Sequence, residues 1–180
     1  MNASIRALHC SNAHTFSKVE EPTLTLLAGL GVDGDAHCGS TVKHRSRVAI
    51  DPSQPNLRQV HLLSAEILEA LNAQGYLLKP GDLGENITTT GIDLHELPTG
   101  TVLRLGDSAL IALTGLRNPC RQIESFRDGL LRHVVSKDRD GNIVRSAGVM
   151  AIVVQGGDVH RGDPIVAQPP PPPHTALARV

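Results

Sequence analysis

Short segments rich in β-forming residues recur along this chain, and turns containing glycine or aspartate separate them. They occupy residues 2–10, 23–27, 59–63, 101–105, 108–113, 148–154 and 164–167. The pair Gly106-Asp107 joins two of them and predicts a tight hairpin. Because the segments do not alternate regularly with helices, the pattern predicts a mainly β fold with helices. We expect a closed or nearly closed β-barrel, not a doubly wound parallel sheet.

Two segments have helical spacing. Residues 64–75 place aliphatic side chains on one face, with Ser64 as the N-cap and Gly75 at the end, and we expect this helix to be structural. Residues 120–135 also have helical spacing, but Gly129 is expected to weaken this second helix and to divide it in two.

Composition excludes several classes of protein. The 180 residues carry a net charge of −1 and only three aromatic side chains (two Phe, one Tyr), so neither a basic field nor a stacking platform for nucleic acid is expected. No apolar run approaches the ~20 residues that a membrane-spanning helix needs, and the N-terminus lacks the apolar core of a signal peptide. The cysteines Cys10, Cys38 and Cys120 cannot form a full disulfide framework, so we expect free thiols in a reducing cytoplasm.

The segment that carries Cys120 combines a strand, a break and a helix start. An apolar run ends at Gly115, and helical spacing begins near Pro119. Cys120 would then lie at a helix N-terminus between Arg117 and Arg121, where the helix dipole and the two guanidinium groups favour a thiolate. A small apolar residue buried in a strand-to-helix junction is the alternative interpretation.

Two glycine-rich polar stretches are candidate walls of a site. Residues 29–39 contain four glycines and present Asp35 and His37, together with Asp33 and Cys38, on a backbone that can approach a ligand closely. Residues 79–91 favour a site in which Asn86 and nearby backbone amides face the ligand, although a simple turn before a strand is the alternative.

A basic run follows the first glycine-rich stretch. Lys43, Arg45 and Arg47 are candidates to surround a phosphate together with His37, although such a run is more often a solvated surface. No Walker A or G-x-G-x-x-G pattern accompanies it, so an ordinary nucleotide-binding fold is not supported.

The C-terminal tail is a separate segment. Residues 169–173 are all proline, which favours polyproline II and cannot join a sheet. We expect residues 1–168 to form one domain and residues 169–180 to form an extended, proline-rich surface arm.

Six motifs in order resemble the MOSC domain, the module named for the C-terminal part of molybdenum cofactor sulfurases. They are Gly31-Val-Asp-Gly-Asp-Ala-His-Cys-Gly39, His61-Leu-Leu-Ser-Ala-Glu66, Gly81-Asp-Leu-Gly-Glu-Asn-Ile87, Leu97-Pro-Thr-Gly-Thr-Val-Leu103, Arg117-Asn-Pro-Cys120, and Gly148-Val-Met-Ala-Ile-Val with Gly162-Asp163. The chain resembles the small stand-alone bacterial members of the family. The resemblance implies a β-barrel like that of pyruvate kinase.

The resemblance also implies a site centred on Cys120. In relatives that reduce N-hydroxylated compounds, the matching cysteine is thought to ligate the molybdenum of a molybdopterin cofactor. Lys18, Asp35, His37 and Asn86 match family positions near that site. Lys18, Arg117 or Arg121 would neutralise the phosphate of the pterin.

The resemblance leaves two functions open. As an oxidoreductase, the protein would act on a small N-hydroxylated substrate and take electrons from a separate reductase, because the chain shows no flavin, haem or iron–sulfur motif. As a sulfur carrier, it would accept sulfane sulfur on Cys120 as a persulfide from a cysteine desulfurase. Pyridoxal phosphate would then belong to the desulfurase, and a Schiff base on Lys18 is not expected.

Zinc is a third hypothesis. His9, Cys10 and His14 lie close together in the sequence, and His37 with Cys38 would complete a ligand set. The spacing matches no zinc ribbon or zinc finger.

Overall fold

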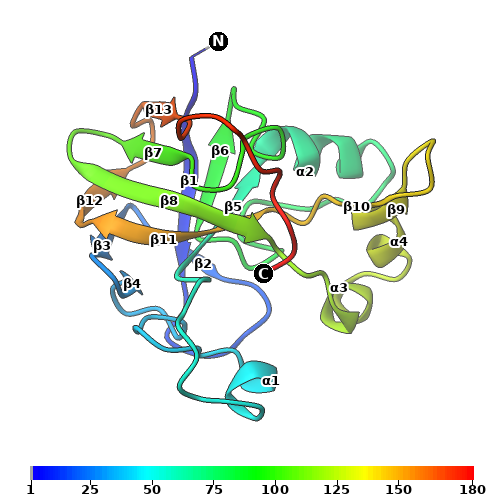
Figure 1. The fold of residues 1–180 in the computed structure, drawn as a ribbon. Helices are drawn as coiled ribbons and strands as arrows, with labels where there is room; N and C mark the ends of the chain where they lie inside the picture. Colours follow the sequence, from blue (N-terminus) through cyan, green and yellow to red (C-terminus); the bar gives the residue numbers. More distant parts are fainter. Residues whose placement is uncertain (1) are drawn as a thin grey trace.

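A curled eight-stranded sheet forms the body of the molecule (Figure 1). The computed structural model describes residues 2–180, apart from the side chains of residues 45 and 46. Neighbouring strands follow the order β13 (Ile165–Gln168), β7 (Val102–Leu105), β8 (Ala109–Leu116), β11 (Val149–Gln155), β5 (Val60–Ser64), β6 (Ile87–Thr90), β1 (Ser4–Cys10) and β2 (Val19–Glu20).

Backbone hydrogen bonds link β1, next to one end of this sheet, with the β13 end. The Ile5 amide donates to the Asp163 carbonyl at 2.9 Å, and the Ile165 amide donates to the Ala3 carbonyl at 2.9 Å. Strand β1 therefore lies beside the start of β13, and aliphatic side chains fill the space that the sheet encloses. The prediction of a mainly β fold that curls toward a barrel is confirmed.

Two smaller sheets accompany the large one. Strands β3 (Thr23–Leu27), β4 (Gly31–Val32) and β12 (Gly157–His160) form one, and β9 (Val135–Lys137) pairs with β10 (Ile143–Arg145) in the other. The sequence of β12 contains Gly157 and Asp158, residue types that do not favour a strand. It is a strand because each of its residues pairs with β3, from Thr23 to Leu26, which outweighs the local preference.

The helices are short and gather mostly on one side of the sheet (Figure 1). Helix α2 (Ala65–Asn72) joins β5 to β6, which is the parallel pair in the sheet. The predicted second helix is divided into α3 (Arg121–Phe126) and α4 (Leu130–Val134) by Gly129, whose φ of 75° suits glycine. A further short helix, α1 (Arg45–Val48), lies in the basic run. No helix in the described chain is long and apolar enough to cross a membrane.

A second apolar cluster lies under these helices. It packs α2, α3 and α4 against one another through Leu63, Leu68, Leu71, Leu78, Leu83, Ile123, Leu130, Val134 and Ala147. This cluster fixes the start of α3 and thereby the turn that carries Cys120.

The end of the tail returns to the sheet and is not a free arm. Leu177 is buried in the main core, and the Leu116 amide at the end of β8 donates to the Ala178 carbonyl at 2.8 Å. Gly115 leaves room for this approach, because a Cβ there would collide with Ala178 and Val180. The proline run cannot pair with a sheet, but it spans the distance that lets residues 175–180 do so.

Candidate functional site

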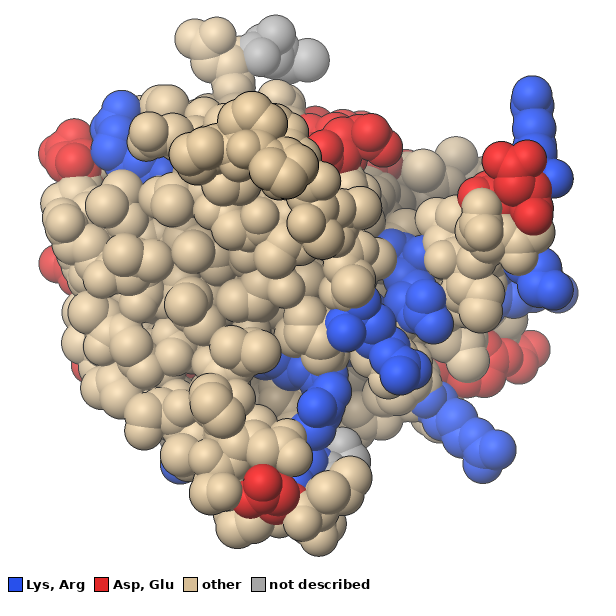
Figure 2. Space-filling view, viewed as in Figure 1, with Lys and Arg blue, Asp and Glu red and all other residues tan. Residues whose placement is uncertain are grey.

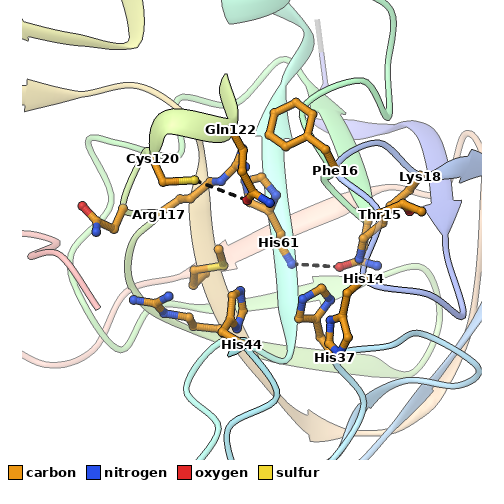
Figure 3. Close-up of a pocket in the computed structure, with 15 residues that line it drawn as sticks. His14, Thr15, Phe16, Lys18, His37, His44, His61, Arg117, Cys120 and Gln122 are labelled. Atoms are coloured by element: carbon orange, nitrogen blue, oxygen red, sulfur yellow. Dashed lines mark hydrogen bonds between the residues drawn. The ribbon is translucent and has the colours of Figure 1, made fainter. Parts of the chain in front are cut away.

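A cavity of about 400 Å³ opens beside the turn between β8 and α3. Figure 3 shows its side chains, with Cys120 and Arg117 from this turn and His37 and Lys18 from loops after β4 and β1. Asn86, just before β6, completes the group. Loops far apart in the sequence meet here because their strands end at the same rim.

Cys120 occupies the N-cap position of α3, without a capping hydrogen bond from its side chain, and is exposed at this cavity. Its Sγ donates to Oε1 of Gln122 at 3.4 Å. Arg117 is half-buried beside it and donates to the carbonyl of Leu83 at 2.6 Å, while its guanidinium lies 5.7 Å from the centre of the Phe16 ring. The alternative of a buried junction cysteine is therefore wrong.

Asp35 lies directly behind the cavity wall and gathers several donors. Its Oδ2 accepts from Lys18 Nζ at 2.5 Å and from Asn86 Nδ2 at 2.9 Å. Its Oδ1 accepts from the His37 amide at 2.9 Å and lies 3.0 Å from His37 Nδ1. This carboxylate therefore fixes the side chains of Lys18, His37 and Asn86 with respect to one another.

Burial and neighbouring charges have opposite effects on the pKa values of Asp35 and Lys18. Burial alone would raise the pKa of Asp35, but the hydrogen bonds and charges of His37 and Lys18 outweigh it, and the pKa lies well below its usual range. Burial lowers the pKa of Lys18, and Asp35 opposes that change. Because their charged forms stabilise each other at 2.5 Å, we treat the two as an ion pair.

Asn86 uses its amide entirely within the protein. Besides Asp35, its Nδ2 donates to the His9 carbonyl at 3.2 Å, and its Oδ1 accepts from the His61 amide at 3.1 Å. Asn86 thus ties the second glycine-rich loop to β1 and β5. It lines the cavity as a positioning residue.

Histidine rings cover another part of the wall. The His37 ring lies 4.5 Å from that of His44 and 5.0 Å from that of His14. Burial first, and then the charges of His37 and Arg58, lower the pKa of His44 to about 3. His44 is therefore neutral at pH 7 and can accept a hydrogen bond from a ligand.

The structure groups most of the predicted site residues. Lys18, His37, Asn86, Arg117 and Cys120 line the cavity, and Asp35 supports three of them. The predicted Arg121 is exposed and does not line it.

Sequence reasoning missed Arg58, His44, Gln122 and Met150, which also line this cavity. Gln122 could have been predicted from the sequence, since it lies two residues after Cys120. Arg58 had none, because it is a single charge just before a buried strand.

Two further hypotheses find little support in the geometry. The described residues contain no group of three or more His, Cys, Asp or Glu side chains placed to hold a metal ion, so the zinc ligands are not assembled. In the basic run, Lys43 packs near Gly39 and Arg47 lines a different cavity, while the Arg45 side chain lies outside the described residues.

Comparison with known proteins gives a consistent result. The model of the MOSC domain matches residues 34–166. The crystal structure of the YuaD protein from Bacillus subtilis has a TM-score of 0.78 and 24% identity, covering 95% of this chain and 98% of that one.

YiiM proteins are also similar. The Escherichia coli protein has a TM-score of 0.63 and 20% identity, covering 97% of this chain and 73% of its own. YiiM from Geobacillus stearothermophilus has a TM-score of 0.63 and 16% identity, covering 92% of this chain and 75% of its own. At these identities the similarity shows the fold. No curated protein matches the sequence.

Proposed function

Because the chain belongs to the MOSC domain family, we propose that its cavity binds the molybdenum cofactor, that Cys120 is the metal ligand, and that the protein reduces N-hydroxylated compounds. The observation that carries the proposal is an exposed thiol on a cavity lined by basic side chains.

The donor set fits this group. A cysteine thiolate is a soft ligand suited to a polarizable, redox-active metal. Arg117 lines the same cavity as the thiol, so a guanidinium is available for the phosphate of a pterin, whereas the Lys18 ammonium is already paired with Asp35. The volume of about 400 Å³ lies within the range of small-molecule sites.

The residues of the chain have separate tasks in this proposal. Cys120 holds the metal as a thiolate. In the free protein, the protonated thiol donates a hydrogen bond to Gln122. Arg117 is fixed by Leu83 and Phe16 and presents a positioned charge. Neutral His44 adds a hydrogen-bond acceptor to the opposite wall.

The bound cofactor supplies oxygen-atom transfer chemistry. The overall reaction converts N–OH to N–H and water and consumes two protons and two electrons, which a separate reductase provides. An exposed thiol that is neither oxidised nor paired is best preserved in a reducing compartment, so we propose a cytoplasmic location.

The second candidate is a sulfur carrier, which the exposure of Cys120 favours. The Cys120 thiolate would attack the outer sulfur of a desulfurase persulfide. One S–S bond breaks as another forms, and the desulfurase leaves with its own thiolate.

Metal analysis separates the two candidates. Protein purified from a host that makes the cofactor should contain about one molybdenum per chain, because each chain offers one Cys120 thiolate as a ligand. Cys120→Ser should lose it, and the matched variant Cys38→Ser should keep it. Equal molybdenum in both variants would refute the ligand assignment.

For the carrier, incubation with a desulfurase and cysteine should add about 32 Da to Cys120, the mass of one sulfur.

A further inference from the structure

A second cavity, of about 250 Å³, lies between the loop around α1 and the returning tail. Arg47 comes from α1, Arg58 from the segment before β5, and Arg179 from the tail. Arg58 also lines the first cavity, so the two cavities share a wall. Figure 2 shows Lys and Arg side chains gathered on this face beside the end of the tail.

No Asp or Glu side chain in the described part of the chain pairs with Arg47, Arg58 or Arg179. The guanidinium of Arg58 donates to the backbone oxygen of Val180, which uses only part of its set of five N–H donors.

The positive charges of this cluster repel one another. Burial first, and then the charges of Arg47, Arg117 and Arg179, lower the pKa of Arg58 to about 10. Like charges that repel at a partly buried position are stabilised by an anion, which neutralises them and accepts their hydrogen bonds.

We propose that the second cavity binds a phosphate-type anion through Arg47, Arg58 and Arg179, and that the docked tail completes this site. Guanidinium groups match the oxygen geometry of phosphate, and several of them balance a doubly charged group better than a single carboxylate. The inference goes beyond the proposed function, because it requires neither molybdenum nor catalysis.

The proposed anion site is complete only when the tail is docked on β8. Arg179 reaches the cavity because residues on both sides of it pair with β8, where Ala178 accepts from the Leu116 amide and the Val180 amide donates to the Leu116 carbonyl at 3.3 Å. Anion binding and tail docking should therefore stabilise each other, since a ligand that binds only the docked state increases its population.

Calorimetric titration of the full chain with pyrophosphate at low ionic strength tests the site. Arg47→Gln and Arg179→Gln should each weaken binding by about 5- to 20-fold, as expected for loss of a charged hydrogen bond. Arg161→Gln, an exposed arginine in the turn before β13, is the matched control and should bind like the wild type. Pyrophosphate should also slow hydrogen exchange of the Val180 amide.

Three results would overturn the proposal. They are an absence of pyrophosphate binding, binding that Arg47→Gln and Arg179→Gln leave unchanged, and loss of binding in the Arg161→Gln control to the same extent. The titration detects the anion directly and does not require metal. It can therefore succeed where the molybdenum proposal fails, or fail where it succeeds.

Discussion

Replacing Asp35 with asparagine tests whether the site depends on one buried carboxylate. The Asp35 side chain is 1% exposed and that of Lys18 is 5% exposed, so the ion pair between them is almost free of solvent. Asparagine has nearly the same shape but no charge. The substitution therefore leaves the Lys18 ammonium in a desolvated position without its anion.

The expected loss is large. Removing one partner of a buried ion pair costs about 3–5 kcal/mol, because the remaining charge is uncompensated. The hydrogen bonds from His37 and Asn86 to the carboxylate weaken as well, since an amide presents one acceptor where the carboxylate presents two. For a domain whose total stability is about 5–15 kcal/mol, this is a severe effect.

Urea denaturation at pH 7 measures it. Asp33→Asn is the matched control, since Asp33 is an exposed aspartate in the same loop. Lys18→Met combined with Asp35→Asn should recover part of the loss, because the double variant no longer buries an unpaired charge. If Asp35→Asn changed the free energy of unfolding by no more than Asp33→Asn does, the reasoning would be refuted.

Acid titration adds a second criterion. Because the pKa of Asp35 is lower in the folded protein than the ordinary value of 3.8, the folded state favours its ionised form. Its contribution to stability is present above that ordinary value and is lost as the pH falls below it. The Asp35→Asn variant should lose this part of the acid dependence.

Two further predictions concern the tail and the histidine wall. Gly115→Ala places a methyl group against Ala178 and Val180, so the tail should detach and limited proteolysis should cut it, whereas an intact tail would contradict the docking. The pKa of His44, about 3 in the folded protein against 6.5 ordinarily, means that the unfolded state binds the extra proton between these values. The free energy of unfolding should therefore fall as the pH decreases below 6.5, and His44→Gln should flatten this slope in urea melts at pH 4.5 and 7.

The sequence predicted those parts of the fold that depend on local chemistry. Residues 23–27 alternate with period two and form β3 with the expected bounds. Gly106 has a positive φ in the predicted hairpin turn, and Gly129 divides the helix as expected. β12 and the docked tail could not be predicted, because each is stabilised by a strand distant in sequence.

The residues of the candidate site also fall into those that local sequence predicts and those that it does not. Cys120, His37 and Asn86 were predicted because they lie in loops with unusual composition. Arg58 and His44 acquire their roles only from three-dimensional proximity. Local sequence patterns cannot predict a guanidinium that faces two cavities, because its burial and its neighbouring charges arise only in the folded chain.

The two walls of the first cavity have different supports. Lys18 and His37 are fixed through Asp35 to Asn86, and Asn86 is hydrogen-bonded to the backbones of β1 and β5, so this wall is as rigid as the sheet. The opposite wall carries Cys120 on a turn at the end of β8, where the tail pairs. Anion binding that strengthens tail pairing would therefore act on the thiol-bearing wall and leave the Asp35 network unchanged, because no hydrogen bond described for Asp35 reaches the tail.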